Sequence, residues 1–216
     1  MTPAQIQAAA RRKYNAVGDT FFTDDEFYYL IYEAETKLAE EAMVIQNTYS
    51  STSVASQREY AWPTRAISIK RVEYDGSKLK FINMREDDVI TLLNTDVTDT
   101  GTPEFYVVWQ RSIFLRKTPG TSALTIKVYS YDLPSLQSTP GATLDSPEIY
   151  HKDIVNFLVA NMAIKDGNAS IHDRFMGMWN EAVLKAVKFQ RKRVGQDGMR
   201  QVNNVDSLIS TSIGYV

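Results

Sequence analysis

The sequence contains no cysteine and only two histidines among its 216 residues. The absence of cysteine excludes disulfide scaffolds, thiolate zinc sites, iron–sulfur clusters and a cysteine nucleophile. His151 and His172 alone supply few ligands for a metal and few groups for acid–base catalysis. The sequence also lacks the phosphate-binding glycine loops, the GxSxG nucleophile elbow and the HExxH zinc motif. We therefore predict that the protein is not an enzyme and uses no metal and no cofactor.

Long apolar runs and excess charge of one sign are also absent. No stretch approaches the roughly 20 apolar residues of a membrane-spanning helix, and residues 1–17 lack the continuous apolar core of a signal peptide. A net charge of −2 gives no overall attraction to nucleic acid. These features predict a cytosolic chain with no membrane partner.

Apolar residues recur at helical spacing near both ends of the sequence. Residues 23–26, Thr-Asp-Asp-Glu, have the spacing of a capping box, and the apolar pattern that follows predicts a helix over residues 23–47. A shorter, Ala-rich helix is expected over residues 3–15. Two more helices are predicted over residues 146–167 and 168–193. The expected core stripe of the last helix consists of Ile171, Phe175, Met178, Ala182, Ala186 and Phe189.

The middle of the sequence is strand-like. β-Branched and aromatic residues dominate residues 65–74, and the Asp75-Gly76 pair that follows is a strong hairpin signal. Further strands are predicted over residues 78–83, 104–110, 112–117 and 123–131, with a polar loop after Thr48 and a short helix over residues 83–93. Because the spacing leaves no room for crossover helices, we expect an antiparallel meander.

These patterns together predict an α+β fold. The expected architecture is a helical bundle built from the N- and C-terminal helices, with an inserted antiparallel β domain and an extended C-terminal arm. The bundle is expected to comprise residues 1–47 and 146–194, the β domain residues 58–133, and the arm residues 195–216. The sequence Gly-Gln-Asp-Gly at 195–198 is expected to end the last helix.

Two groups of polar residues superficially resemble catalytic sites. His151 and Asp153 are two positions apart on a predicted helix, where side chains diverge, so His151 is interpreted as a solvated or capping residue. Four acids, Glu33, Glu35, Glu40 and Glu41, lie on one amphipathic helix. They are interpreted as its solvent-exposed face, because paired catalytic carboxylates normally come from different elements.

A cluster of cations ends the last predicted helix: Lys185, Lys188, Arg191, Lys192 and Arg193. Cations at this position compensate the helix dipole. The same cluster could face the phosphates of DNA or an acidic protein partner, and the sequence leaves these interpretations open. Phe189, inside the cluster, is assigned to the apolar core stripe.

The predicted strands carry six aromatic residues: Phe105, Tyr106, Trp109, Phe114, Tyr129 and Tyr131. Alternation along a strand places roughly half of them in the core. The remainder could form a platform for a sugar or a base. This defines the alternative function, a binding module whose β domain recognises a glycan or a nucleic acid.

The last 22 residues contain only three charged side chains. A solvated tail is usually richer in charge. The apolar positions are Val202, Val205, Leu208, Ile209, Ile213, Tyr215 and Val216. Simple disorder is one interpretation. We favour an arm that folds onto a partner by adding a strand or filling a groove, because this gives the apolar side chains a place to pack.

The layout resembles the head–tail adaptor (connector) proteins of tailed bacteriophages, in particular those of short-tailed phages. The resemblance is carried by the helix sequence FYYLIYEAE at residues 27–35 and by the segment that begins with Trp62-Pro63 and ends at Gly76. Residues 101–109, residues 123–134 and the paired C-terminal helices within 147–193 add to it. It therefore covers nearly the whole chain.

The resemblance implies a structural virion protein at the head–tail interface, made in the host cytoplasm. Members of the family form a homo-oligomeric ring, commonly of twelve copies, beneath the portal, with the DNA channel through its centre. The C-terminal arm would bind the portal protein, and the opposite face would receive a tail or nozzle protein. The basic cluster could make non-specific contacts with DNA in the channel. The β domain is larger than in the shortest adaptors, so its partner stays open.

Overall fold

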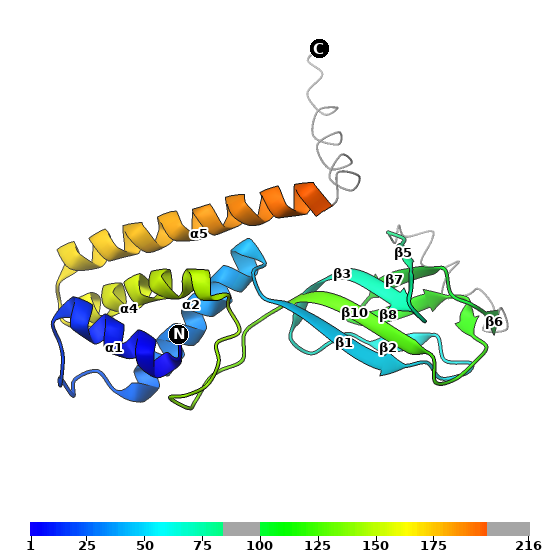
Figure 1. The fold of residues 1–216 in the computed structure, drawn as a ribbon, viewed down its shortest axis with the longest axis horizontal. Helices are drawn as coiled ribbons and strands as arrows, with labels where there is room; N and C mark the ends of the chain where they lie inside the picture. The colour runs from blue at the N-terminus through cyan, green and yellow to red at the C-terminus, as the bar shows by residue number, and fades with distance from the viewer. Residues whose placement is uncertain (84–99, 198–216) are drawn as a thin grey trace, which may run out of the picture. The chain divides into compact units, whose positions relative to one another are not determined.

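The computed structural model describes residues 1–83 and 100–197 of the chain. The fold is α+β, as the sequence predicts, and the chain separates into two compact units (Figure 1). The helical unit comprises Met1–Val44 and Pro134–Val216, and the β unit comprises Ile45–Leu133. The β unit is thus inserted between two parts of the helical one.

The helical unit contains four α-helices and one short 3₁₀-helix within the described residues. They are α1 (Pro3–Tyr14), α2 (Asp24–Ala42), η1 (Glu148–Tyr150), α4 (His151–Lys165) and α5 (Ala169–Asp197). Helix α4 lies between α1 and α5 (Figure 1). Leu158, Val159 and Met162 are almost completely buried, as expected for a central helix that packs against neighbours on several sides.

Both N-terminal helices begin at capping boxes. Thr2 and Gln5 form one at α1, and Thr23 and Glu26 form the predicted one at α2. In each box, the threonine hydroxyl accepts a hydrogen bond from a free backbone amide and the third residue bonds back to the cap. The α2 box depends only on nearby sequence, which is why its position was predictable.

Helix α2 ends at Ala42, five residues before the predicted end, so that prediction is wrong. Met43 adopts a left-handed backbone with φ 51° and caps the helix. The following residues, Val44 and Ile45, are buried but are not helical. Their apolar character extended the helical pattern in the sequence beyond the helix itself.

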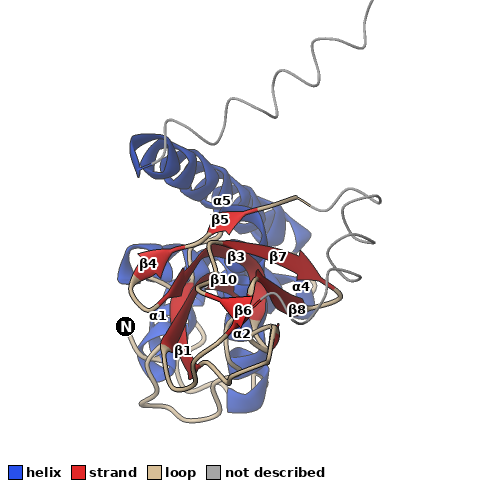
Figure 2. Cartoon of the chain, turned by 90° about the vertical axis from the view of Figure 1, so that its right-hand side faces the viewer, coloured by secondary structure: helices blue, strands red, loops and turns tan. Residues whose placement is uncertain are grey.

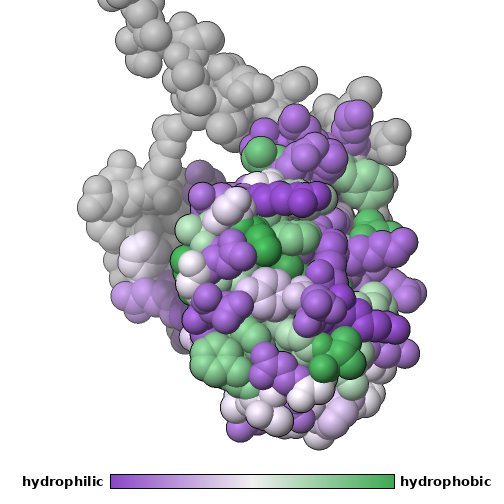
Figure 3. Space-filling view, turned by 90° about the vertical axis from the view of Figure 1, so that its left-hand side faces the viewer, coloured by the Kyte–Doolittle hydropathy of each residue, from purple (hydrophilic) through white to green (hydrophobic). Residues whose placement is uncertain are grey.

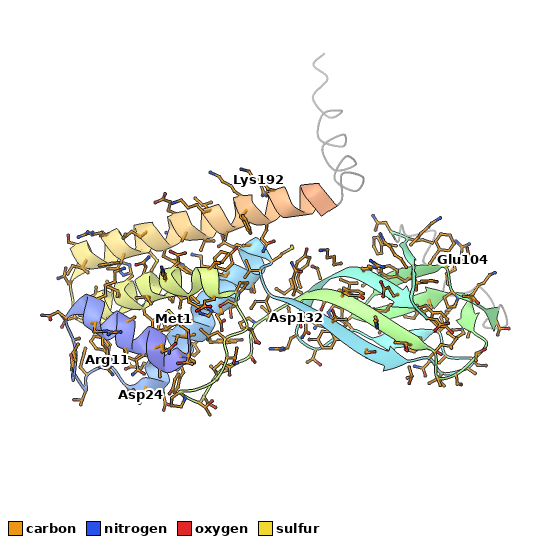
Figure 4. All side chains as sticks on the ribbon, in the orientation of Figure 1. Met1, Arg11, Asp24, Glu104, Asp132 and Lys192 are labelled. Carbon is orange, nitrogen blue, oxygen red and sulfur yellow. The ribbon has the colours of Figure 1, made fainter. Side chains whose placement is uncertain are left out.

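Polar contacts join the helices of this unit. The Lys13 ammonium donates to Asn156 on α4 at 2.6 Å, and the Tyr14 hydroxyl donates to Asp166 at 2.8 Å. Lys165, at the end of α4, pairs with Glu26 of the α2 capping box at 2.5 Å. Arg11 and Asp24, labelled in Figure 4, lie 4.0 Å apart. These contacts fix α1 and α2 against α4.

In the described residues of the β unit, two four-stranded sheets are present (Figure 2). The first has the order β1 (Gln46–Thr52), β10 (Thr125–Asp132), β3 (Ala66–Tyr74) and β4 (Ser77–Lys78). The second has the order β2 (Glu59–Ala61), β8 (Ser112–Arg116), β7 (Phe105–Trp109) and β5 (Lys80–Phe81). A small parallel pair joins β6 (Thr100–Gly101) to β9 (Thr118–Pro119).

One hydrophobic core is shared by the two large sheets. It includes Val72 of β3, Val128 of β10, Tyr106 of β7 and Leu115 of β8, all buried. The predicted hairpin turn lies between β3 and β4, with Asp75 and Gly76 both at positive φ, as a tight two-residue turn requires.

The predicted antiparallel meander is wrong in its order. Strand β10 lies between β1 and β3, and β5 pairs with β7 in parallel. Residues 46–52, most of which were expected to be a loop, form β1, which pairs with β10 from Gln46 opposite Tyr131 to Thr52 opposite Thr125. Strand β1 is polar because it is an edge strand exposed along most of its length. The short helix predicted over residues 83–93 lies almost wholly outside the described residues.

Candidate interaction surfaces of the helical unit

Helix α5 is much longer than the helix on which it packs. It has 29 residues and α4 has 15, so at 1.5 Å per residue α5 is longer by about 20 Å. The Asn168 side chain accepts from the Ile171 amide and caps the start of α5. The C-terminal part of α5 extends beyond α4 (Figure 1). The helix reaches Asp197, which lies within the Gly-Gln-Asp-Gly segment at 195–198 that was expected to end it.

The core stripe of α5 differs from the predicted one. Among the α5 side chains that the structure describes, the buried ones are Trp179, Val183, Ala186 and Gln190. Trp179 packs against Phe157 of α4 with ring centroids 5.3 Å apart. Of the predicted stripe, Ala186 alone belongs to this buried set. Met178 and Phe189 are 45% and 49% exposed, so their assignment to the core is wrong.

The basic cluster near the end of α5 contains one lysine that forms an ion pair and several cations that do not. Lys185 pairs with Glu181 one turn earlier at 2.8 Å, and this hydrogen bond raises the pKa of Lys185. Lys188, Arg191 and Lys192 are exposed, and none pairs with a carboxylate of the described residues. Lys192 projects away from the neighbouring helices (Figure 4). The Arg193 side chain lies outside the described part of the chain.

A groove of about 320 Å³ runs along one flank of α5. Its walls include the exposed apolar residues Ile149, Met178 and Phe189, together with Asp153 and Lys185. Burial raises the pKa of the Asp153 carboxyl, and the charges of Lys185 and Lys13 oppose that shift. Sequence periodicity detected Met178 and Phe189 but assigned them to the core.

A second surface lies on α2. A shallow groove there is lined by Tyr29, Tyr32, Glu33, Lys37, Glu40 and Glu41, together with Phe157 of α4. Tyr29 is 56% exposed. The acids agree with the predicted solvent-exposed face, but the sequence analysis did not identify the two tyrosines beside them. The sequence pattern that could have identified this surface is the spacing of Tyr29, Glu33 and Glu40, which places all three on one side of a helix.

Glu35 is an exception among the α2 acids and contradicts the prediction for that residue. Its side chain is fully buried, and its Oε1 accepts from the Ser146 amide at 2.8 Å. Burial raises the pKa of this carboxyl. Glu35 lies one turn after Ile31 and three residues before Leu38, both of which are core residues. That spacing was the available signal for its burial.

His151 is also buried, so the prediction of a solvated histidine is wrong. Its Nε2 lies 3.0 Å from the Ser146 carbonyl, and its Nδ1 lies 2.7 Å from the Met1 amino group. A neutral ring with its proton on Nε2 donates to the first of these and accepts from the second. His151 therefore bonds to the backbone carbonyl of Ser146, and Glu35 bonds to the backbone amide of the same residue.

The aromatic residues of the β unit do not share one surface. Tyr106 and Tyr131 are buried, whereas Trp109 is 41% exposed. Phe105, Phe114 and Tyr129 are half-buried, and the Tyr129 hydroxyl donates to Glu73 at 3.0 Å. The sugar- or base-binding platform stays a prediction.

The described residues contain no group of three or more His, Asp or Glu side chains arranged to hold a metal ion. Within residues 1–83 and 100–197, no helix is both long enough and apolar enough to cross a membrane. The arm residues Val202, Val205, Leu208, Ile209, Ile213 and Tyr215 lie outside the described residues.

The sequence of the chain matches the model of a known protein family. A family model described as "SU10 adaptor protein" matches residues 1–205 of the chain. The match covers both structural units, so the chain belongs to the SU10 adaptor protein family. This confirms the resemblance to phage head–tail adaptors of short-tailed phages. Among curated proteins, no sequence matches.

Proposed function

We propose that this chain forms a ring beneath the portal of a phage head and joins the portal to a tail or nozzle protein. In this proposal DNA passes through the centre of the ring, and the protein is a structural part of the virion, made in the host cytoplasm and assembled in twelve copies. The observation that carries the proposal is the adaptor-family match over residues 1–205.

Residues 195–216 are the proposed portal-binding arm. They are poor in charge and contain Val202, Val205, Leu208, Ile209, Ile213 and Tyr215. Side chains of this kind gain free energy by leaving water at a partner's surface. Many copies in one ring would add weak individual contacts into strong attachment.

The exposed cations of α5 are the proposed contact for DNA or for an acidic partner. Lys188, Arg191 and Lys192 are free of carboxylate partners among the described residues, whereas Lys185 is engaged with Glu181. Lys188, Arg191 and Lys192 therefore carry this role more than Lys185 does, and Arg193 is proposed with them from the sequence alone. A contact with DNA phosphates would weaken steeply as the salt concentration rises.

Co-sedimentation with the portal ring encoded by the same genome tests the adaptor function. We expect stoichiometric capture that persists at moderate salt, with the number of bound copies matching the portal symmetry. Deletion of residues 195–216 should abolish capture and leave the circular dichroism spectrum of the helices intact. Failure of the full chain to bind the portal would contradict the proposed function, and normal capture of the truncated chain would contradict the arm.

Two variants of the arm, both of unchanged length, test whether its apolar side chains are what binds the portal. One variant replaces Val202, Val205, Leu208, Ile209, Ile213 and Tyr215 with serine. The other keeps these six and replaces the polar residues Gln201, Asn203, Asn204, Ser207, Ser210 and Thr211 with other small polar residues. We expect only the first variant to lose portal capture.

A further inference from the structure

Two exposed surfaces of the helical unit carry opposite charge. The first, here named the α5 face, consists of Met178, Lys185, Lys188, Phe189 and Lys192. The second, here named the α2 face, consists of Tyr29, Tyr32, Glu33, Glu40 and Glu41. Each surface combines exposed apolar side chains with charge. On the α5 face, Lys185 is paired with Glu181 and Asp153 lines the same groove, so the positive charge comes from Lys188 and Lys192. On the α2 face, Lys37 lies among three glutamates, which leaves that face negative.

The two faces flank α5 on different sides. Lys37 of α2 donates to Asn180 of α5 at 3.4 Å, so α2 lies beside the Asn180 side of that helix. Met178 precedes Asn180 by two residues, which at about 100° per residue places it on the far side. The groove beside Met178 and Phe189 accordingly faces away from α2. One copy therefore cannot bring its own two faces together.

The exposed apolar side chains on these faces lie next to one another and are not scattered singly over the surface. Met178 and Phe189 are 45% and 49% exposed, and Ile149 at 65% lies beside them in the same groove. On the α2 face, Tyr29 is 56% exposed, and the half-buried Phe157 lines the same groove. Apolar groups that are rimmed by charge in this way are typical of protein–protein contacts.

Another end of the helical unit offers a weaker candidate. Figure 3 shows hydrophobic residues there as separate patches between hydrophilic ones. Val17, Phe21 and Ile164 are exposed in the described residues, but Lys165 lies over the Phe21 ring at 4.5 Å and partly covers it.

We infer that the α5 face of one copy packs against the α2 face of the next copy, and that this is the contact between neighbouring subunits. The inference rests on the proposed function, which requires a ring. Two different surfaces in contact form a heterologous interface, which repeats from copy to copy and closes when the rotation per subunit divides a full turn. In this contact Lys188 and Lys192 lie against Glu33 and Glu40, so the acidic partner of these two cations is the neighbouring copy. Phe189 covers the tyrosines of the α2 face.

Charge-reversal variants of the full chain test this interface. One variant carries Lys188→Glu and Lys192→Glu, and a second carries Glu33→Lys and Glu40→Lys. Each alone places like charges opposite each other, so we expect each to weaken self-association about 100-fold in sedimentation velocity. An equimolar mixture of the two should assemble again, with the two variants alternating, because every contact then joins opposite charges.

A matched control keeps the change in net charge but moves it elsewhere. Arg12→Glu with Lys127→Glu reverses two exposed cations outside both faces, and we expect this variant to associate like the unmodified chain. Phe189→Ala should weaken association without lowering the free energy of unfolding, because the ring of Phe189 is half exposed within one copy. Rising salt should weaken the contact, since its charges lie near the surface.

The outcomes distinguish this interface from the proposed function. If the unmodified chain assembles and both charge-reversal variants assemble equally well, the two faces are not the contact, while ring formation stands. If the unmodified chain stays monomeric up to about 1 mM, the interface is overturned for the free protein. The portal-capture experiment then still decides the adaptor function independently. Loss of assembly in both variants together with recovery in their mixture supports the interface.

Discussion

His151 shows how burial changes the titration of a single residue. It is 4% exposed, and burial lowers its pKa below the ordinary value of 6.5. The hydrogen bond with the Ser146 carbonyl acts in the opposite direction, and the nearby amino terminus lowers the pKa further. Because the charged ring is disfavoured in the folded protein, protonation favours the unfolded chain.

The free energy of unfolding should therefore decrease as the pH falls. The contribution of His151 is fully present above about pH 6.5, where both states hold a neutral ring, and is lost as the pH falls below this value. We expect a slope of at most about 1.4 kcal/mol per pH unit, measured by urea unfolding between about pH 5 and 7.5. His151→Gln should flatten the slope, whereas His172→Gln should retain it. An unchanged slope in His151→Gln would contradict this assignment.

The contribution of Glu35 to the free energy of unfolding should change with pH in the opposite direction to that of His151. Burial raises its pKa above the ordinary value of 4.5, so the folded protein holds the proton more tightly than the unfolded chain. The contribution to stability is present at low pH and is lost as the pH rises through the raised value. Glu35→Gln keeps an oxygen for the Ser146 amide and removes the charge, so it should remove this pH dependence. Glu35→Ala leaves that buried amide without its partner and should cost about 1–3 kcal/mol.

Urea unfolding of both variants at several pH values checks the Glu35 prediction. Glu40→Gln on the exposed side of the same helix is the control and should change stability by less than about 0.5 kcal/mol. If Glu35→Gln and Glu35→Ala lost the same free energy at every pH, the hydrogen bond to Ser146 would have no measurable role.

At the scale of elements, the predictable features were those set by neighbouring residues. The capping box of α2 and the Asp75–Gly76 hairpin turn were both predicted, because each depends on a few adjacent side chains. Strand β1 was not predicted. Its polar sequence carries no strand pattern, and its conformation comes from pairing with β10, which is distant in the sequence.

The candidate surfaces show the same limit. Apolar spacing on α5 identified a continuous stripe, but spacing alone does not tell which side of a helix meets a neighbour. The true core follows Trp179, Val183 and Ala186, so Met178 and Phe189 stay exposed beside it. The basic cluster was found correctly as a set of cations, whereas the pairing of Lys185 with Glu181 required the structure.

Replacing residues on the two sides of α5 should give very different results. Trp179→Ala removes a fully buried ring that packs on Phe157 and should lower the free energy of unfolding by about 3–5 kcal/mol. Met178→Ala changes a neighbouring, exposed side chain and should cost less than about 1 kcal/mol. Chemical denaturation of the two variants, compared with the unmodified chain, measures both. Equal losses would mean that the predicted stripe, and not the Trp179 side, is the core face.

At the scale of the whole molecule, the inserted β unit has the features of an independent folding unit. Its core residues, among them Val72, Tyr106 and Leu115, all come from residues 45–133. The two ends of the insertion are joined by a hydrogen bond from the Asp132 amide to the Ile45 carbonyl at 3.0 Å. The helical unit therefore needs only a short connection to replace the insertion, and a short loop has a low closure entropy.

We therefore expect residues 45–133 to fold when produced alone, because both of their sheets and the core between them are retained. We also expect the helical unit to fold when Val44 is joined to Pro134 through a short Gly/Ser linker, because the α4 core and its contacts with α1, α2 and α5 all lie within that unit. Circular dichroism and cooperative thermal unfolding of each piece provide the measurement. A matched linker that joins Ala42 to Pro134 removes the buried Val44 and should lower the melting temperature of the helical piece. If neither piece unfolds cooperatively while the full chain does, the two units depend on each other for folding, and the insertion is not autonomous.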